Sequence, residues 1–77
     1  MRWNEPIWDV LDYAIVQIVE RNPGTTIPAV VRAVGETIPE GTIRNRVRRL
    51  AAHDVIQTER LLGRYYVLTP GAGLEAV

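Results

Sequence analysis

Apolar residues recur at helical spacing in the first third of the chain and predict a first helix over about residues 5–21. Asn4, followed by Glu5 and Pro6, has the form of a helix start, with a capping side chain and a proline in the first turn. The stripe expected to face the core consists of Ile7, Leu11, Ala14 and Ile18, with Ile15 beside it. Asn22-Pro23-Gly24 ends this helix, because proline and glycine together break helices.

A second, shorter helix is predicted over about residues 26–34. Thr25 or Thr26 is expected to cap it, and Pro28 is tolerated in a first turn. Its buried side consists of Val30, Val31 and Val34. Gly35 is expected to end it.

The third predicted helix covers about residues 40–53. Thr37 and Glu40 have the spacing of a capping box, although Pro39 could instead place the first turn one residue later. At about 100° per residue, three apolar residues form one narrow core stripe: Ile43, Val47 and Leu50. The opposite side is expected to hold Gly41, Asn45, Arg48 and Ala52, with Arg44 and Arg49 flanking it and Arg46 nearer the core edge.

After His53-Asp54 the hydrophobic pattern changes from helical to alternating, which predicts two strands, 55–61 and 64–68, with a tight turn at Leu62-Gly63. Asp54 stands where a helix end usually needs a left-handed residue. Thr69-Pro70 is interpreted as the start of a short final helix. The predicted fold is therefore α+β: one domain over residues 1–77, with three helices and a C-terminal hairpin.

Composition narrows the possible functions. The 77 residues, 47% of them hydrophobic, suffice for one modest core. The chain has no cysteine, no serine and one histidine, which rules out disulfides, thiolate metal sites and a serine triad. We therefore expect a protein that is not an enzyme and has no metal, no cofactor and no evident small-molecule ligand. No apolar run is long enough for a membrane span and no secretory signal is visible, so a cytoplasmic location is expected.

The formal net charge of zero conceals a segregation of charge. Residues 1–40 hold three arginines against six acidic residues, a balance of −3, whereas residues 41–64 hold six arginines against two, a balance of +4. Such segregation predicts one basic face that attracts a polyanion. All nine basic residues are arginine, whose planar fork suits phosphate and guanine, although a GC-rich or salt-adapted genome that avoids lysine explains this somewhat better.

The order of three helices and a hairpin, with a basic third helix, resembles a winged helix-turn-helix domain. Four segments carry the resemblance: Asn22-Pro23-Gly24-Thr25-Thr26 before the second helix, Thr42–Leu50 in the third, Val55-Ile56 at the start of the wing, and Tyr66–Gly71 at its exit. The segment Thr42–Leu50 is similar to the recognition helix of MarR-like and Lrp-like regulators, and the short lysine-free chain resembles archaeal repressors of this type. The resemblance covers about residues 7–71. Asp54 departs from the glycine common at that corner.

The resemblance implies binding of double-stranded DNA by the third helix and the wing. The candidate contact residues are Thr42, Arg44, Asn45, Arg48, Arg49, Arg60 and Arg64. Arginine can hold guanine O6 and N7 together, and an amide such as that of Asn45 can hold adenine. The competing interpretation is a solvated helix face whose arginines pair with Glu40 or Asp54.

Four residues at or before the first helix are candidates for a homodimer interface: Trp3, Trp8, Tyr13 and Val16. Val16 is expected to face away from the core stripe, although a small domain could wrap these side chains over its own edge. The function expected from the sequence is a sequence-specific transcriptional regulator, a repressor that acts by occupying its operator. The alternative is a winged helix that serves as a protein-interaction module in a larger assembly.

Overall fold

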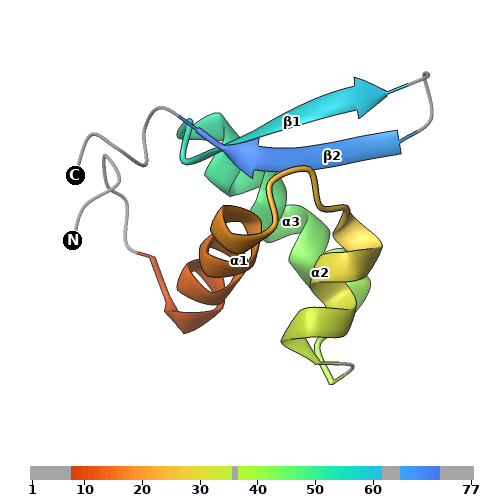
Figure 1. The fold of residues 1–77 in the computed structure, drawn as a ribbon. Coiled ribbons are helices and arrows are strands. Elements are labelled where there is room, and N and C mark those ends of the chain that lie inside the picture. Colours follow the sequence, from red (N-terminus) through yellow and green to blue (C-terminus); the bar gives the residue numbers. More distant parts are fainter. Residues whose placement is uncertain (1–7, 36, 62–64, 72–77) are drawn as a thin grey trace.

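The computed structural model describes residues 8–35, 37–61 and 65–71. Within them, three helices precede an antiparallel hairpin: α1 (Val10–Arg21), α2 (Ile27–Val34), α3 (Glu40–Ala52), β1 (Ile56–Leu61) and β2 (Tyr65–Pro70). The hairpin lies across one end of the helices (Figure 1). The predicted element order and the α+β class are confirmed.

The start of α1 differs from the prediction. Trp8 and Asp9 are not helical, and Asp9 is the N-cap. The Asp9 carboxylate accepts from the Asp12 amide at 3.1 Å, while the Asp12 carboxylate accepts from the Asp9 amide at 3.0 Å. This reciprocal capping box fixes the first turn at Val10, so a helix running unbroken from Glu5 is wrong. The predicted start at Asn4-Glu5-Pro6 lies outside the described residues.

The buried face of α1 is also rotated from the predicted stripe. It consists of Asp12, Ile15, Val16 and Val19, whereas Leu11, Ala14 and Ile18 are only partly buried. Val16 is 2% exposed and Trp8 is 8% exposed, so the expectation that Val16 faces away from the core is wrong. The spacing of the observed buried face is helical, but its first residue is an aspartate. The hydrophobic pattern therefore favoured the neighbouring stripe.

The next two helices match their predicted bounds within one residue. The Thr26 hydroxyl accepts from the Ala29 amide at 3.4 Å at the start of α2, and Gly35 follows its end with φ +119°. Pro39 is itself the N-cap of α3 and makes no side-chain capping bond, so the predicted Thr37–Glu40 capping box is wrong. The predicted core stripe of α3 is confirmed, since Ile43, Val47 and Leu50 are all buried.

The corner between α3 and β1 has the hydrogen bonds of a Schellman motif. The Asp54 amide donates to the Ala51 carbonyl at 3.0 Å, and the Val55 amide donates to the Leu50 carbonyl at 2.9 Å. Asp54 has φ +61°, which confirms the left-handed conformation predicted for it. Gly71 closes on this corner, because its amide donates to the Val55 carbonyl at 2.9 Å and a Cβ there would collide with the Asp54 carbonyl.

The hairpin is paired from Ile56 opposite Pro70 to Leu61 opposite Tyr65. Thr69 and Pro70 belong to β2, so the prediction that they start a final helix is wrong. Proline is compatible with a strand at its end, where no ladder donor is needed. The predicted turn at Leu62-Gly63 lies outside the described residues.

A second contact of β2 was not predicted. The Gly24 amide donates to the Leu68 carbonyl, and the Leu68 amide donates to the Thr25 carbonyl, both at 2.8 Å. The α1–α2 loop is thereby fixed to the hairpin. Together with the core residues Val30, Ile43 and Leu68, all fully buried, this bridge holds the hairpin against the helices. Within the described ranges, no helix is long and apolar enough to cross a membrane.

Candidate nucleic-acid interface

One side of α3 is exposed and polar. Arg44, Asn45 and Arg48 are exposed on this helix, together with Gly41 and Ala52. They lie away from the buried Ile43, Val47 and Leu50, as the helical spacing predicts. The outcome is a row of hydrogen-bond donors on a helix whose other side is anchored in the core.

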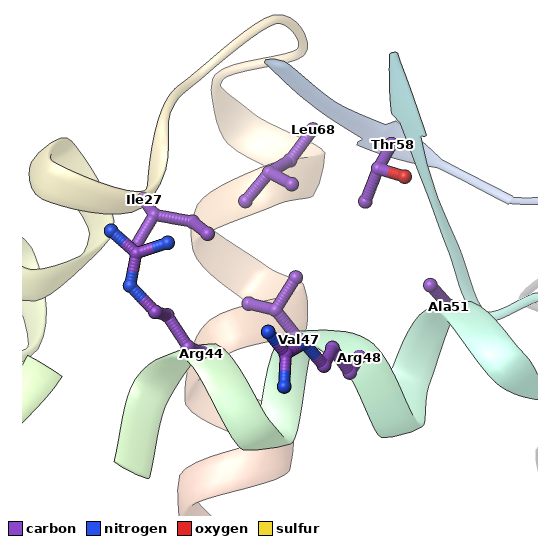
Figure 2. A pocket seen from close by; sticks show the side chains of 7 residues that line it. All are labelled: Ile27, Arg44, Val47, Arg48, Ala51, Thr58 and Leu68. Atoms are coloured by element: carbon purple, nitrogen blue, oxygen red, sulfur yellow. The ribbon is translucent and has the colours of Figure 1, made fainter. Parts of the chain in front are cut away.

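A groove of about 310 Å³ runs beside this row, between α3, the start of α2 and the hairpin. It is lined by Ile27, Arg44, Val47, Arg48, Ala51, Thr58 and Leu68 (Figure 2). The lining combines aliphatic side chains with two guanidinium groups, both carried by α3. The groove therefore places two guanidinium groups beside apolar surface.

Arg44 is held by an ion pair within α3. Its Nη2 donates to Glu40 Oε2 at 2.6 Å, and its Nε donates to the same oxygen at 3.1 Å. Each side chain is 48% exposed, so the pair lies at the surface. For Arg44, the interpretation that helix arginines pair with Glu40 is therefore correct.

Arg46 faces the opposite direction, toward the start of α1. Its Nη1 lies 2.6 Å from both carboxylate oxygens of Asp9 and 3.4 Å from Oδ2 of the fully buried Asp12. The hydrogen bond from Arg46 is the main reason why the pKa of Asp9 falls from 3.8 to about 2. Arg46 is thus a structural residue, consistent with its predicted place near the core edge.

Arg49 is the fourth arginine of α3 and also faces the residues before α1. Its guanidinium carbon lies 5.0 Å from the centre of the Trp8 ring, in a cation–π contact. The His53 ring meets Trp8 edge-on with centroids 5.4 Å apart. Arg49 is therefore partly buried and packed, in contrast to its predicted place flanking the exposed row.

The other residues predicted to contact DNA or a second copy of the chain are spread over α3, the hairpin and α1. Thr42 is partly buried in the first turns of α3, where its amide donates to the Pro39 carbonyl at 3.0 Å. Arg60 is exposed on β1, on the same strand face as Ile56 and Thr58 because strand side chains alternate. Tyr13 is partly buried against the core. The predicted positions Trp3 and Arg64 lie outside the described residues.

Two kinds of residue that line the groove or hold its helix in place were not predicted from the sequence. Ile27 and Thr58 line the groove, and the alternation of β1 could have indicated Thr58, since it shares a face with the buried Ile56. Asp9 and Asp12 hold Arg46 across 37 and 34 residues of sequence, and no local pattern indicates such a pair. Among the described residues, no cluster of three or more His, Cys, Asp or Glu could hold a metal ion.

Three helices, an exposed third helix and a packed two-stranded wing define a winged helix-turn-helix fold. The fold is similar to that of the MarR crystal structure, with a TM-score of 0.76 and 24% sequence identity over 88% of this chain and 50% of MarR. It is also similar to the transcriptional regulator SlyA, with a TM-score of 0.73 and 14% identity over 88% of this chain and 47% of SlyA. The chain spans about half the length of either neighbour. No protein-family model and no curated protein sequence matches it.

Proposed function

We propose that this chain binds double-stranded DNA in a sequence-specific manner and thereby regulates transcription. The observation that carries the proposal is the exposed row of Arg44, Asn45 and Arg48 on a helix whose opposite side is buried. The major groove of B-DNA admits one α-helix, and arginine and asparagine are the side chains that read guanine and adenine there. The balance of +4 over residues 41–64 adds attraction for the phosphates.

The proposed roles of the residues follow from their surroundings. Asn45 reads a base edge from the exposed side of α3, and Arg48 contacts phosphate. Arg60 contacts the DNA backbone from β1, because it shares its strand face with Thr58 at the groove, and the same role is proposed for Arg64, which lies outside the described residues. Thr42 is proposed to donate to a phosphate near the start of α3. Arg49, which packs on Trp8, is a weaker candidate than Arg48.

Repression by occupying the operator is the simplest form of this function. The proposed DNA contacts lie on α3 and the hairpin, and the chain spans about half the length of its structural neighbours MarR and SlyA. A bound domain of this kind blocks access of other proteins to the same DNA by steric exclusion.

A second copy of the chain is the proposed protein partner, so that two recognition helices reach half-sites about one helical turn apart. Because Trp8 and Val16 are buried in the monomer, the interface rests on other residues. Tyr13 and Val10 lie three residues apart on α1, and Val10 is 83% exposed. Val10→Glu places an acidic residue at the start of a helix, where it is tolerated. We expect it to shift the sedimentation of the protein from dimer to monomer without unfolding it. A wild type that sediments as a monomer at high micromolar concentration would exclude the dimer.

DNA binding itself is tested by titrating labelled random-sequence duplex with the protein at about 50 and 200 mM salt. We expect binding at low salt and a marked loss at high salt, as for a protein that displaces counterions. A protein-interaction module, which is the alternative, would leave the duplex unbound at both salt concentrations.

A further inference from the structure

We infer that Glu40 is a specificity-determining residue that acts by positioning Arg44 and cancelling its attraction to phosphate. The inference rests on the proposed function and adds to it an acidic residue, which does not itself attract DNA. It starts from the Glu40–Arg44 pair, whose two short contacts use one carboxylate oxygen of Glu40.

The geometry of the pair leaves half of the guanidinium fork available. Glu40 accepts from Nε and Nη2 of Arg44, which is one edge of the planar group. Among the residues that the structure describes, no acceptor is bonded to Nη1, so the edge formed by Nη1 and Nη2 stays open at the groove, where Arg44 is one of the lining residues (Figure 2). Guanine presents O6 and N7 side by side in the major groove, and two parallel N–H donors match them.

The charge of Glu40 determines what a bound Arg44 can distinguish. A guanidinium beside a carboxylate has little net charge to offer a phosphate, and a carboxylate approaching the backbone is itself repelled. The two donors of the open edge are retained, however, and they are satisfied by guanine but not by adenine or a pyrimidine. Arg44 is therefore suited to read a base rather than to raise affinity for any duplex.

Arg48 provides the contrast within the same helix. It lies one turn further along and lines the same groove, but in the part of the chain that the structure describes its guanidinium has no carboxylate within ion-pair distance. Its full charge is available to phosphate. The exposed row thus separates a general contact at Arg48 from a reading contact at Arg44.

A purely structural role of Glu40 is the competing explanation, because an acidic residue in a first turn also stabilises its helix. The test compares Glu40→Gln with Glu20→Gln, which removes the same charge from an exposed position on α1. Both variants are titrated with random-sequence duplex at about 50 and 200 mM salt, and both select duplexes from a random library. The same substitution of Glu40 is repeated in an Arg44→Ala background.

We expect Glu40→Gln, but not Glu20→Gln, to steepen the slope of log affinity for random duplex against log salt concentration by about 0.9. This corresponds to roughly an additional threefold loss of affinity between the two salt concentrations. Its selected duplexes should show a weaker guanine preference at one position of the site. In the Arg44→Ala background that preference should already be absent and unchanged by Glu40→Gln.

Equal behaviour of Glu40→Gln and Glu20→Gln in both assays would overturn the role of Glu40 while leaving DNA binding intact. A guanine preference that survives Arg44→Ala would also overturn it. Failure of the wild type to bind any duplex would instead contradict the proposed function, so the two failures are distinguishable.

Discussion

Arg46 and Asp9 are joined by two contacts of 2.6 Å, although 37 residues separate them in the chain. The same guanidinium lies 3.4 Å from Oδ2 of Asp12, which is fully buried and whose Oδ1 has no hydrogen-bond partner in the described part of the chain. The middle of α3 is thereby fixed to the start of α1. The proposed reading of DNA by α3 requires that this helix keep one orientation, and the cluster supplies that constraint at the side away from the groove.

Replacing Arg46 with methionine should destabilise the fold by about 2–3 kcal/mol, because the buried Asp12 carboxylate loses its ion pair and keeps only the hydrogen bond from the Asp9 amide. The free energy of unfolding in urea measures this. Arg32→Met, at an exposed position on α2, is the matched control and should change stability by about 0.5 kcal/mol or less. The double variant Asp12→Leu with Arg46→Met should recover part of the loss, since it removes the buried carboxylate, while the Asp9 amide loses its acceptor. A double variant no more stable than the single one would contradict this account.

The pH dependence of stability should show the same cluster. The pKa of Asp9 is about 2 in the folded protein against an ordinary value of 3.8, so the unfolded chain binds the proton more readily. The contribution of Asp9 is therefore fully present above its ordinary pKa and is lost as the pH falls from there toward 2. Asp9→Asn should flatten the decline of unfolding free energy over that range, whereas Glu20→Gln should leave it unchanged. Parallel declines in wild type and Asp9→Asn would contradict the assignment.

Asp54→Gly should stabilise the protein. Asp54 has φ +61°, a conformation that glycine adopts without the steric penalty of a Cβ. The gain is limited by the greater freedom of glycine in the unfolded chain, so we expect about 0.5–1 kcal/mol in thermal or urea unfolding. Gly71→Ala is the opposing variant and should be clearly destabilising, because its Cβ would meet the Asp54 carbonyl. A destabilised Asp54→Gly would mean that the aspartate side chain contributes more than its backbone strain costs.

Arg48→Ala should weaken binding to every duplex to a similar extent. It should also flatten the slope of log affinity against log salt concentration by about 0.9, the effect of one lost phosphate contact. Arg21→Ala removes the same charge at the end of α1 and should leave the slope nearly unchanged. The measurement is a titration of random duplex at several salt concentrations. If both variants give the wild-type slope, Arg48 is a solvated surface residue.

The sequence predicts the order of the elements because each boundary has a strong local signal. Thr26, Gly35 and Asp54 mark helix ends through their own backbone and side-chain chemistry, and in the structure all three lie at helix ends. The predicted start of α1 was wrong because Asn4-Glu5-Pro6 and Asp9–Asp12 both have the form of a helix start. The predicted core face of α1 was wrong because Asp12 becomes a core residue only when Arg46 pairs with it.

The candidate site was likewise predictable only where local spacing decides the direction of a side chain. The direction of Asn45 and Arg48 follows from helical spacing around the buried Ile43, Val47 and Leu50. The separation of the four arginines into groove-facing and structural pairs does not follow, because the partners Asp9 and Trp8 come from the segment before α1. Tertiary partners, rather than the local pattern, decide which arginines remain available.

The reading of sequence by Asn45 is the central claim, and its most direct test is a base-preference profile. Wild type and Asn45→Ala should each select duplexes from a random library, and bound fragments should be compared. We expect the wild type to enrich a defined site and the variant to accept other bases at one A·T pair per half-site, with a loss of about 1–3 kcal/mol on the wild-type site. Binding to random duplex should be nearly equal, since no charge is lost. Superimposable profiles would contradict the role of Asn45, and a wild type that enriches no site would contradict sequence-specific binding altogether.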